Sequence, residues 1–354
     1  MRTRKIVALG LVGAMVVSVL TGCGINKNDT IATFSDGTKV TLGIANFSAR
    51  YQQAANDELY RSILGDDVWT QDLYGNGSTM QESVKEEMIE ELHEMYTLKA
   101  HMSDYSVSLT DDEKKAIADT VAAFMDANQP EVLREIGATT DIVEEYLTLH
   151  TIKSKMHDAI IVDADTNVSD EEANMRAYTM LSFPTSGYYD ESYNYVAYTD
   201  EEVAEIEQDA EDVFNAITAP EDLESVAEEH GYSATTGTYD ADNTSLSEDL
   251  KTTLDELAEG EMSDLISTDS GKYIVRLDAE TDEEATESNR ESIISERQSD
   301  LYDEVLAGWQ ENDGWTVEEK AVAKIEFKNM FNAPEEDTTE DSGDNSVETE
   351  TTEE

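Results

Sequence analysis

The chain has 354 residues, of which 81 are Asp or Glu and 23 are Lys or Arg, so its formal net charge at pH 7 is −58. A surface this acidic repels phosphate backbones, which excludes nucleic acid as a partner. The length and the hydrophobic fraction of 39% are sufficient for two or three domains with buried cores.

The N-terminus has the features of a secretory signal that ends in a lipobox. Arg2, Arg4 and Lys5 precede an apolar run over residues 6–20, and Leu20-Thr21-Gly22-Cys23 closes it. The run is shorter than the ~20 residues that a membrane-spanning helix needs, which disfavours an ordinary transmembrane anchor. The sequence therefore predicts a signal peptide over residues 1–22, a lipid on Cys23, and a short tether over residues 23–29.

Lipidation at Cys23 predicts the location of the mature protein. A thioether-linked lipid with a further acyl chain would hold it stably at the cell membrane, on the extracytoplasmic face. Cys23 is the only cysteine, so the mature chain can form no internal disulfide.

Residues 30–170 follow a mostly helical pattern after one short hairpin. The hairpin is expected over residues 31–34 and 39–42, around the turn Ser35-Asp36-Gly37. Apolar residues then recur at helical spacing, and Thr110 with Glu113 forms a capping box. Helices are expected over residues 47–64, from Met80 to Met102, from Thr110 to Phe124, in a short segment that ends at Gly137, and from a cap at Thr140 to Ile160.

A separate α+β module is predicted over residues 171–283. Residues 177–183 form a compact apolar strand, and a Tyr-rich loop over residues 184–198 follows it. Two helices, a loop or edge strand, a short helix over 247–257 and a closing strand over 272–277 complete a β-α-α-β-α-β order.

The remaining C-terminal elements are too few to bury a core of their own. A helix and an alternating strand over residues 322–327 are expected within residues 284–330, and they must dock on the early helices. The module is then an insertion into one discontinuous domain, and the fold class is α+β. Residues 331–354 are strongly acidic and are expected to form a disordered tail.

The end of the module resembles a known family. Gly260-Glu261-Met262-Ser263, followed by residues 267–277, resembles the end of a parvulin-type peptidyl-prolyl isomerase domain. With the lipobox and the flanking helical halves, the chain resembles the PrsA foldases, secreted lipoprotein relatives of SurA and trigger factor. This resemblance implies a discontinuous, mostly helical chaperone domain with an inserted parvulin-like module, whose partners are unfolded or partly folded secreted proteins.

The resemblance also implies a site. Leu246 and Leu250 match positions that line the family's proline pocket, and Ser270 matches a Ser beside the closing strand. Thr179 and Tyr273 stand where the family has a pair of His residues, and a Thr–Tyr hydrogen bond could replace that pair. Isomerisation has to lower an amide rotation barrier of about 18–20 kcal/mol without covalent chemistry, so neither a cofactor nor a metal is expected.

The substituted His positions make catalysis doubtful and leave three functions open. The first is a membrane-anchored extracytoplasmic foldase or chaperone, the second is an active peptidyl-prolyl isomerase, and the third is a solute-binding or adhesive lipoprotein. The tyrosines over residues 188–198 are either a mobile polar loop or a surface that holds extended chains. The oligomeric state, monomer or dimer, also stays open.

Cys23→Ser is expected to release the protein from the membrane. Without the thiol no lipid can be attached, and the acidic body has no attraction for anionic lipid. Fractionation of bacterial cells that process lipoproteins should show the wild type in the membrane pellet and the variant in the soluble fraction. A variant that stays in the pellet would contradict the lipid anchor.

Overall fold

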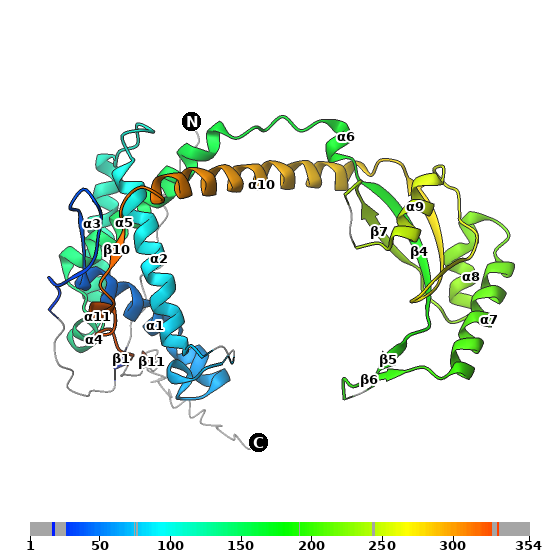
Figure 1. The fold of residues 1–354 in the computed structure, drawn as a ribbon, viewed down its shortest axis with the longest axis horizontal. Coiled ribbons are helices and arrows are strands. Elements are labelled where there is room, and N and C mark those ends of the chain that lie inside the picture. The colour runs from blue at the N-terminus through cyan, green and yellow to red at the C-terminus, as the bar shows by residue number, and fades with distance from the viewer. Residues whose placement is uncertain are drawn as a thin grey trace, which may run out of the picture. The chain divides into compact units, whose positions relative to one another are not determined.

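The structure is a computed structural model of the chain (Figure 1), and it describes residues 16–17, 26–73, 75, 77–190, 192–242, 245–327 and 331–332. The chain divides into two compact units, a helical unit from residues 1–163 and 301–354 and a module from residues 164–300. The helical unit is dominated by α-helices, and the module contains a four-stranded sheet with helices packed on it. The predicted α+β class is confirmed.

The predicted signal peptide, Cys23 and the acidic tail lie almost entirely outside the described residues. In the signal segment the structure describes β1 (Val16–Val17), which pairs antiparallel with β11 (Phe331–Asn332). Among the residues that the structure describes, no helix combines the length and the apolar character needed to cross a membrane.

Caps in the sequence set where the principal helices of the helical unit begin. Thr79 and Thr110 each form a capping box with the Glu three residues later, which satisfies backbone N–H groups of the first turn. Thr139, rather than the expected Thr140, caps the fifth helix through the backbone N–H of Ile142. The helices are α1 (Leu42–Leu64), α2 (Met80–Ala100), α3 (Asp111–Ala127), α4 (Pro130–Glu135) and α5 (Thr140–Ile160), with short 3-10 turns η1 (Val68–Thr70) and η2 (Ile161–Asp163).

Helix α1 lies at the centre of the helical core. Residues 42–50 are buried without interruption, and apolar side chains of α2, α3 and α5 pack around them. A helix segment surrounded on all sides does not need an amphipathic pattern, so residues 42–50 need no polar face.

Two buried charged residues of α1 have partners. The Arg50 guanidinium, 1% exposed, lies 2.6 Å from the Glu135 carboxylate and 5.2 Å from the ring centre of Phe331. The Asp57 carboxylate, fully buried, accepts hydrogen bonds from Trp69 Nε1 at 2.6 Å and Arg61 Nε at 3.2 Å. These contacts offset the cost of burying charge and attach distant segments to α1.

The N-terminal hairpin is confirmed, but one predicted strand is wrong. β2 (Thr30–Thr33) pairs with β3 (Lys39–Thr41), and β10 (Thr316–Val317) adds to the other edge of β2. Residues 322–327, expected as a strand, instead contain the end of α11 (Glu319–Val322), a turn, and residues 325–327, which belong to no strand of the described chain. Ile325 and Phe327 are buried alternately. The alternation of apolar and polar residues thus correctly predicted which side chains are buried. It did not predict the secondary structure, because a strand also needs a backbone hydrogen-bonding partner.

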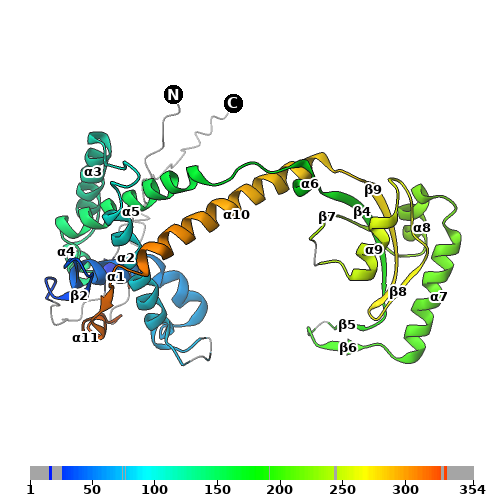
Figure 2. The ribbon, with the colours of Figure 1, turned by 45° about the horizontal axis from the view of Figure 1, so that its top comes forward.

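The module has a sheet with the strand order β7-β4-β9-β8. Long strands β4 and β9 pair antiparallel at its centre. Helices α7 and α8 pack on one face and α9 on the other (Figures 1 and 2). Its elements are α6 (Asp170–Ala173), β4 (Arg176–Pro184), β5 (Gly187–Tyr189), β6 (Tyr195–Ala197), α7 (Asp200–Ala216), η3 (Pro220–Asp222), α8 (Leu223–Glu229), β7 (Thr235–Tyr239), α9 (Glu248–Glu256), β8 (Ile266–Thr268) and β9 (Gly271–Ala279).

Two differences from the sequence prediction concern the ends of the module. The expected Tyr-rich loop contains the β5–β6 hairpin. The division between units falls at residues 163/164 and 300/301 rather than at 170/171 and 283/284, and the second division lies inside the continuous helix α10 (Glu283–Gln310). Arg290 and Arg297 of α10 bind backbone oxygens of residues 165–168, which assigns this part of the helix to the module.

His150 on α5 is a partly buried titratable group whose Nε2 atom is inaccessible to solvent. Its Nε2 has no hydrogen-bond partner in the part of the chain that the structure describes, and its ring lies 4.3 Å from that of Tyr146. Burial lowers the pKa of His150 to about 4, from an ordinary value of 6.5. The folded protein therefore holds this imidazole neutral at pH values where an unfolded chain would protonate it.

The helical unit is expected to lose stability as the pH falls from about 6.5 to 4. In this window the unfolded chain binds a proton at His150 that the folded chain does not, at a cost of about 3 kcal/mol by pH 4. His150→Phe should remove that part of the pH dependence, whereas His157→Gln, about half exposed on the same helix, should not. Urea unfolding followed by Trp fluorescence measures it, because Trp69, Trp309 and Trp315 all belong to this unit. Equal pH dependence in wild type and His150→Phe would contradict the assignment.

Candidate functional site

The α9 side of the module sheet carries most of the residues that the resemblance implied. Leu250 and Leu254 of α9 pack on Val275 and Leu277 of β9. Partly buried side chains border this cluster and give the face an apolar surface: Tyr178, Met180, Leu246, Leu257, Ile266 and Tyr273.

Thr179 and Tyr273 lie on opposite faces of the sheet. Side chains alternate along each strand, and directly paired residues share a face. The register pairs Ser182 with Tyr273 and Thr179 with Arg276, so Tyr273 shares its face with Ser182, and Thr179 points to the α7 and α8 side. The expected Thr–Tyr hydrogen bond is therefore wrong. Tyr273 lies three residues before Arg276, the cross-strand partner of Thr179, and an odd separation along a strand places two side chains on opposite faces.

The Tyr273 hydroxyl instead belongs to a chain of hydroxyls near the β8–β9 turn. Tyr273 Oη lies 2.9 Å from Ser270 Oγ, and Ser270 Oγ lies 3.0 Å from Thr268 Oγ1. Either atom of each pair can donate, so the chain can orient a proton toward a carbonyl oxygen. The structure thus brings Ser270 and Tyr273, two of the implied site residues, together.

The two leucines that the resemblance implied differ in accessibility. Leu250 is 5% exposed and forms part of the core between α9 and β9. Leu246 is partly buried at the edge of the same cluster. A bound side chain could contact Leu246 directly, whereas Leu250 supports the surface from beneath.

Tyr178 is a residue of this face that the sequence analysis missed. Its ring lies 5.8 Å from that of Tyr239, its hydroxyl lies over Gly237, and burial raises its pKa. A Cβ at Gly237 would come within 2.7 Å of the Tyr178 hydroxyl, so Gly237 makes room for the ring. A predicted pairing of the first and last strands of the module would have placed Tyr178 on the same face as Tyr273, because side chains alternate along a strand.

Thr179 takes part in a structural network on the other face. Its hydroxyl donates to Asp278 Oδ2 at 2.7 Å and accepts from Arg276 at 3.2 Å. Arg276 also forms a two-pronged pair with Glu224 of α8, with N–O distances of 2.9 and 2.6 Å. These hydrogen bonds from Arg276 lower the pKa of Glu224. Thr179 therefore helps to attach α8 to the sheet, and its surroundings offer no proline surface.

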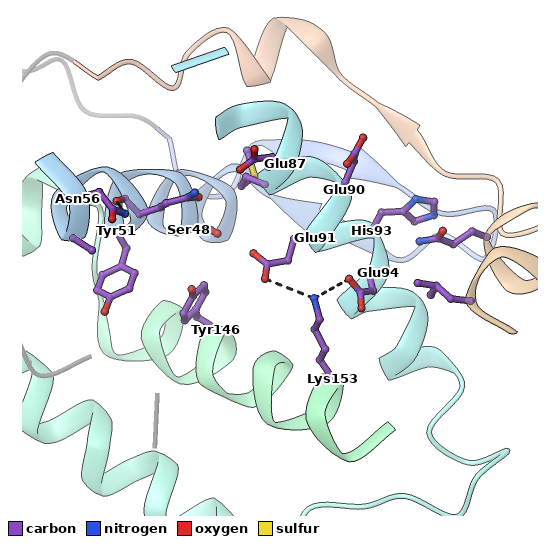
Figure 3. Close-up of a pocket in the computed structure, with 15 residues that line it drawn as sticks. Ser48, Tyr51, Asn56, Glu87, Glu90, Glu91, His93, Glu94, Tyr146 and Lys153 are labelled. Atoms are coloured by element: carbon purple, nitrogen blue, oxygen red, sulfur yellow. Dashed lines mark hydrogen bonds and ion pairs between the residues drawn. The ribbon is translucent and has the colours of Figure 1, made fainter. Parts of the chain in front are cut away.

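The helical unit holds a second candidate site, a cavity of about 850 Å³ (Figure 3). Helix α1 contributes Tyr51 and Asn56, helix α5 contributes Tyr146 and Lys153, and the end of α10 contributes Leu306. Helix α2 supplies a row of acidic side chains at helical spacing: Glu87, Glu90, Glu91 and Glu94.

Lys153 neutralises only part of this acidic wall. Its Nζ lies 2.8 Å from Glu94 and 3.9 Å from Glu91. Burial nevertheless raises the pKa of Glu91, and the neighbouring carboxylates add to this effect. The cavity combines aromatic walls with unbalanced negative charge, which suits a cationic or amphipathic side chain better than an anionic one.

His93, which lies at the edge of this cavity, has a structural role. Its Nε2 lies 2.7 Å from Asp313, and its ring stacks on Trp315 at 4.5 Å. Contacts from a segment more than two hundred residues away hold the ring in place.

Comparison with protein families identifies part of the chain. Residues 188–290 match the model of the PPIC-type peptidyl-prolyl isomerase domain. This match confirms the predicted resemblance to parvulin-type isomerases. It includes Leu246, Leu250, Ser270 and Tyr273, but it begins after β4 and so leaves out Thr179. No curated protein matches the chain.

Several solved structures are similar to the chain over most of its length. The foldase PrsA from Streptococcus pneumoniae is 18% identical, covers 72% of this chain and 97% of its own, and has a TM-score of 0.28. PrsA from Lactococcus lactis is 14% identical over 84% and 97%, with a TM-score of 0.32. A SurA-like chaperone of Campylobacter jejuni is 10% identical over 82% and 100%, with a TM-score of 0.28. Scores this low do not establish a shared function.

Removal of the Thr179 hydroxyl is expected to affect stability rather than ligand binding. Thr179→Val removes the buried hydroxyl that bonds to Asp278 and Arg276, which still pair with each other, and should destabilise the module by about 1–2 kcal/mol. Thr179→Ser retains the hydroxyl, and Tyr273→Phe alters only the partly exposed face, so both should cost less. Hydrogen exchange of the β4 and β9 amides reports on this unit, which has no Trp. Faster exchange in Tyr273→Phe than in Thr179→Val would contradict the two-face arrangement.

Proposed function

We propose that this protein is a membrane-anchored foldase that assists secreted proteins on the extracytoplasmic side of the cell membrane. The observation that carries the proposal is the PPIC-type match over residues 188–290, in a chain whose N-terminus reads as a lipoprotein signal. An acidic body is repelled by anionic lipid, so a lipid on Cys23 is the natural means of attachment.

Two surfaces would contact an unfolded client. The cavity of the helical unit offers Tyr51, Tyr146 and a row of carboxylates to amphipathic or basic side chains. The α9 face of the module offers Leu246, Tyr178 and Tyr273 to apolar segments that include proline. Several weak contacts on one chain give useful affinity and still allow release.

Catalysis by the module would be weak in this proposal. The Ser270 and Tyr273 hydroxyls border its apolar face near the β8–β9 turn, and Thr179 faces the other way. A hydroxyl can donate a hydrogen bond to the amide but cannot switch its charge near neutral pH as His does. The module would then serve chiefly as a binding surface.

An active peptidyl-prolyl isomerase is the second candidate, and the family match itself favours it. The reaction needs a dry surface for the proline ring and a donor that stabilises the twisted amide. Leu246 and the Ser270–Tyr273 hydroxyl pair could supply both. A solute-binding or adhesive lipoprotein has no comparable observation in its favour.

Two assays on residues 24–354 separate these functions. We expect the protein to suppress aggregation of a chemically unfolded model protein at roughly equimolar amounts. We expect it to accelerate a proline-limited refolding reaction by less than about tenfold, because a positioned acid–base group typically contributes about 10²–10⁴-fold and the described residues of this face include none that titrates near neutral pH. A larger acceleration that Tyr273→Phe reduces, and that Glu228→Gln on the exposed side of α8 does not, would establish the isomerase instead.

Absence of both effects would reject the foldase proposal. In that case the third function, a solute-binding or adhesive lipoprotein, would be favoured. Circular dichroism of each variant has to match the wild type, so that a lost effect is assigned to the surface and not to unfolding.

A further inference from the structure

Exposed apolar side chains are concentrated in one short segment of the module. Among the described residues, nine large apolar side chains are strongly exposed, and five of them lie within residues 188–196. Tyr193 is 88% exposed and Tyr189 is 70% exposed. Scattered exposed apolar residues are ordinary, but a contiguous group marks an interaction surface.

These residues form a ribbon, which we define as the described residues of the β5–β6 hairpin and its turn, 187–190 and 192–198. Tyr189 pairs with Tyr195 on one face, with ring centres 5.6 Å apart, and Tyr188 lies 5.6 Å from Tyr198 on the other. Both faces of the ribbon therefore carry aromatic rings. The ribbon lies beyond the end of β4 and apart from the four-stranded sheet (Figures 1 and 2).

Local hydrogen bonds hold the ribbon in shape without covering its rings. The Asp190 carboxylate accepts from the backbone N–H groups of Ser192 at 2.8 Å and Asn194 at 2.9 Å, and the Tyr195 hydroxyl donates to the Ser186 carbonyl at 2.7 Å. Gly187 has φ +152, and a Cβ there would come within 2.2 Å of the Val196 carbonyl. A two-stranded hairpin is marginally stable alone. In this hairpin the additional hydrogen bonds stabilise the backbone while the aromatic side chains remain exposed.

The charge around the ribbon specifies the chemistry of its partner. No Lys or Arg occurs between Arg176 and Lys251, whereas Asp190 lies in the turn and Asp200, Glu201 and Glu202 follow directly. Hydrogen bonds from the Asn194 and Ser192 backbone lower the pKa of Asp190, so it remains ionised in mildly acidic surroundings. A cationic partner is attracted to such a surface, and a second copy of this acidic chain is repelled.

We propose that the ribbon captures extended, Lys- and Arg-containing segments of unfolded polypeptides. The tyrosine rings offer π faces to guanidinium and ammonium groups, and their hydroxyls can bond to an extended backbone. Each strand of the ribbon also has one edge that no strand of the described chain occupies, where a client could pair through its main chain. The inference rests on the proposed foldase function and names the client chemistry that it would select.

The probe for this site is a fluorescein-labelled, unstructured Gly/Ser peptide with several arginines, and its match with glutamates in their place. Both are titrated with residues 24–354 and followed by fluorescence anisotropy at about 0.05 M and 0.3 M salt, because screening weakens exposed charge attraction. The arginine peptide should bind more tightly than the glutamate peptide, and the difference should shrink at the higher salt.

Variants assign that binding to the ribbon. Tyr189→Ser with Tyr193→Asn should weaken binding of the arginine peptide about fivefold, the loss of two exposed cation–π contacts. Asn suits position 193 because Tyr193 has φ 60. Tyr189→Phe with Tyr193→Phe retains the rings and should bind within about twofold of the wild type. Val162→Ser removes an apolar side chain that is 76% exposed elsewhere and should change nothing.

Three results would overturn the inference. The first is wild-type affinity for the arginine peptide in the Tyr189→Ser/Tyr193→Asn variant, and the second is equal binding of the glutamate and arginine peptides by the wild type. The third is a wild-type dimer that becomes a monomer in this variant, measured by light scattering, because a second copy would then occupy the ribbon. Suppression of aggregation separates a failure of the ribbon as capture site from a failure of the foldase function. If the variant loses no peptide affinity while the wild type still suppresses aggregation, the foldase proposal stands and the ribbon is not its capture site.

Discussion

The alternation of side chains across the β4–β9 pair determines what this module can do. From Tyr178 to Phe183 the paired residues of β4 and β9 face alternately α9 and the α7 and α8 pair, and the only register shift lies between Ala177 and Tyr178. Tyr178 and Tyr273 consequently border an apolar surface, while Thr179 is committed to a charged network with Arg276 and Asp278. The Ser270–Tyr273 part of the α9 face offers hydroxyl groups beside an apolar surface, and the charged pair of Arg176 with Asp255 lies farther along the same face.

The helical unit meets a different constraint, because its central helix buries polar residues. Arg50 and Asp57 could not remain in the core without partners, and those partners come from remote parts of the chain: Glu135, Trp69 and Phe331. Such contacts join the beginning and the end of the chain into one unit. The insertion of the module between them therefore leaves the helical core intact.

Negative charge gives the two units a common preference. Acidic side chains line the cavity of the helical unit, and they flank the aromatic ribbon of the module. In both sites tyrosine rings accompany the carboxylates, so the same basic, extended chain suits both. Self-association of such surfaces is disfavoured for the same reason, which is useful for a protein that has to bind unfolded chains without aggregating.

The α+β class, the N-terminal hairpin, the capping boxes that start α2 and α3, and the parvulin-like segment at residues 260–277 could be predicted from the sequence, because these depend on neighbours within a few residues. Three features required the three-dimensional structure: Thr179 and Tyr273 are separated by the sheet, residues 322–327 form no strand within the described chain, and the Tyr-rich segment forms a hairpin. Each of these outcomes depends on register or on a backbone partner distant in sequence. The periodicity of apolar residues predicts which side chains are buried, but the register with the neighbouring strand determines which of them contact one another.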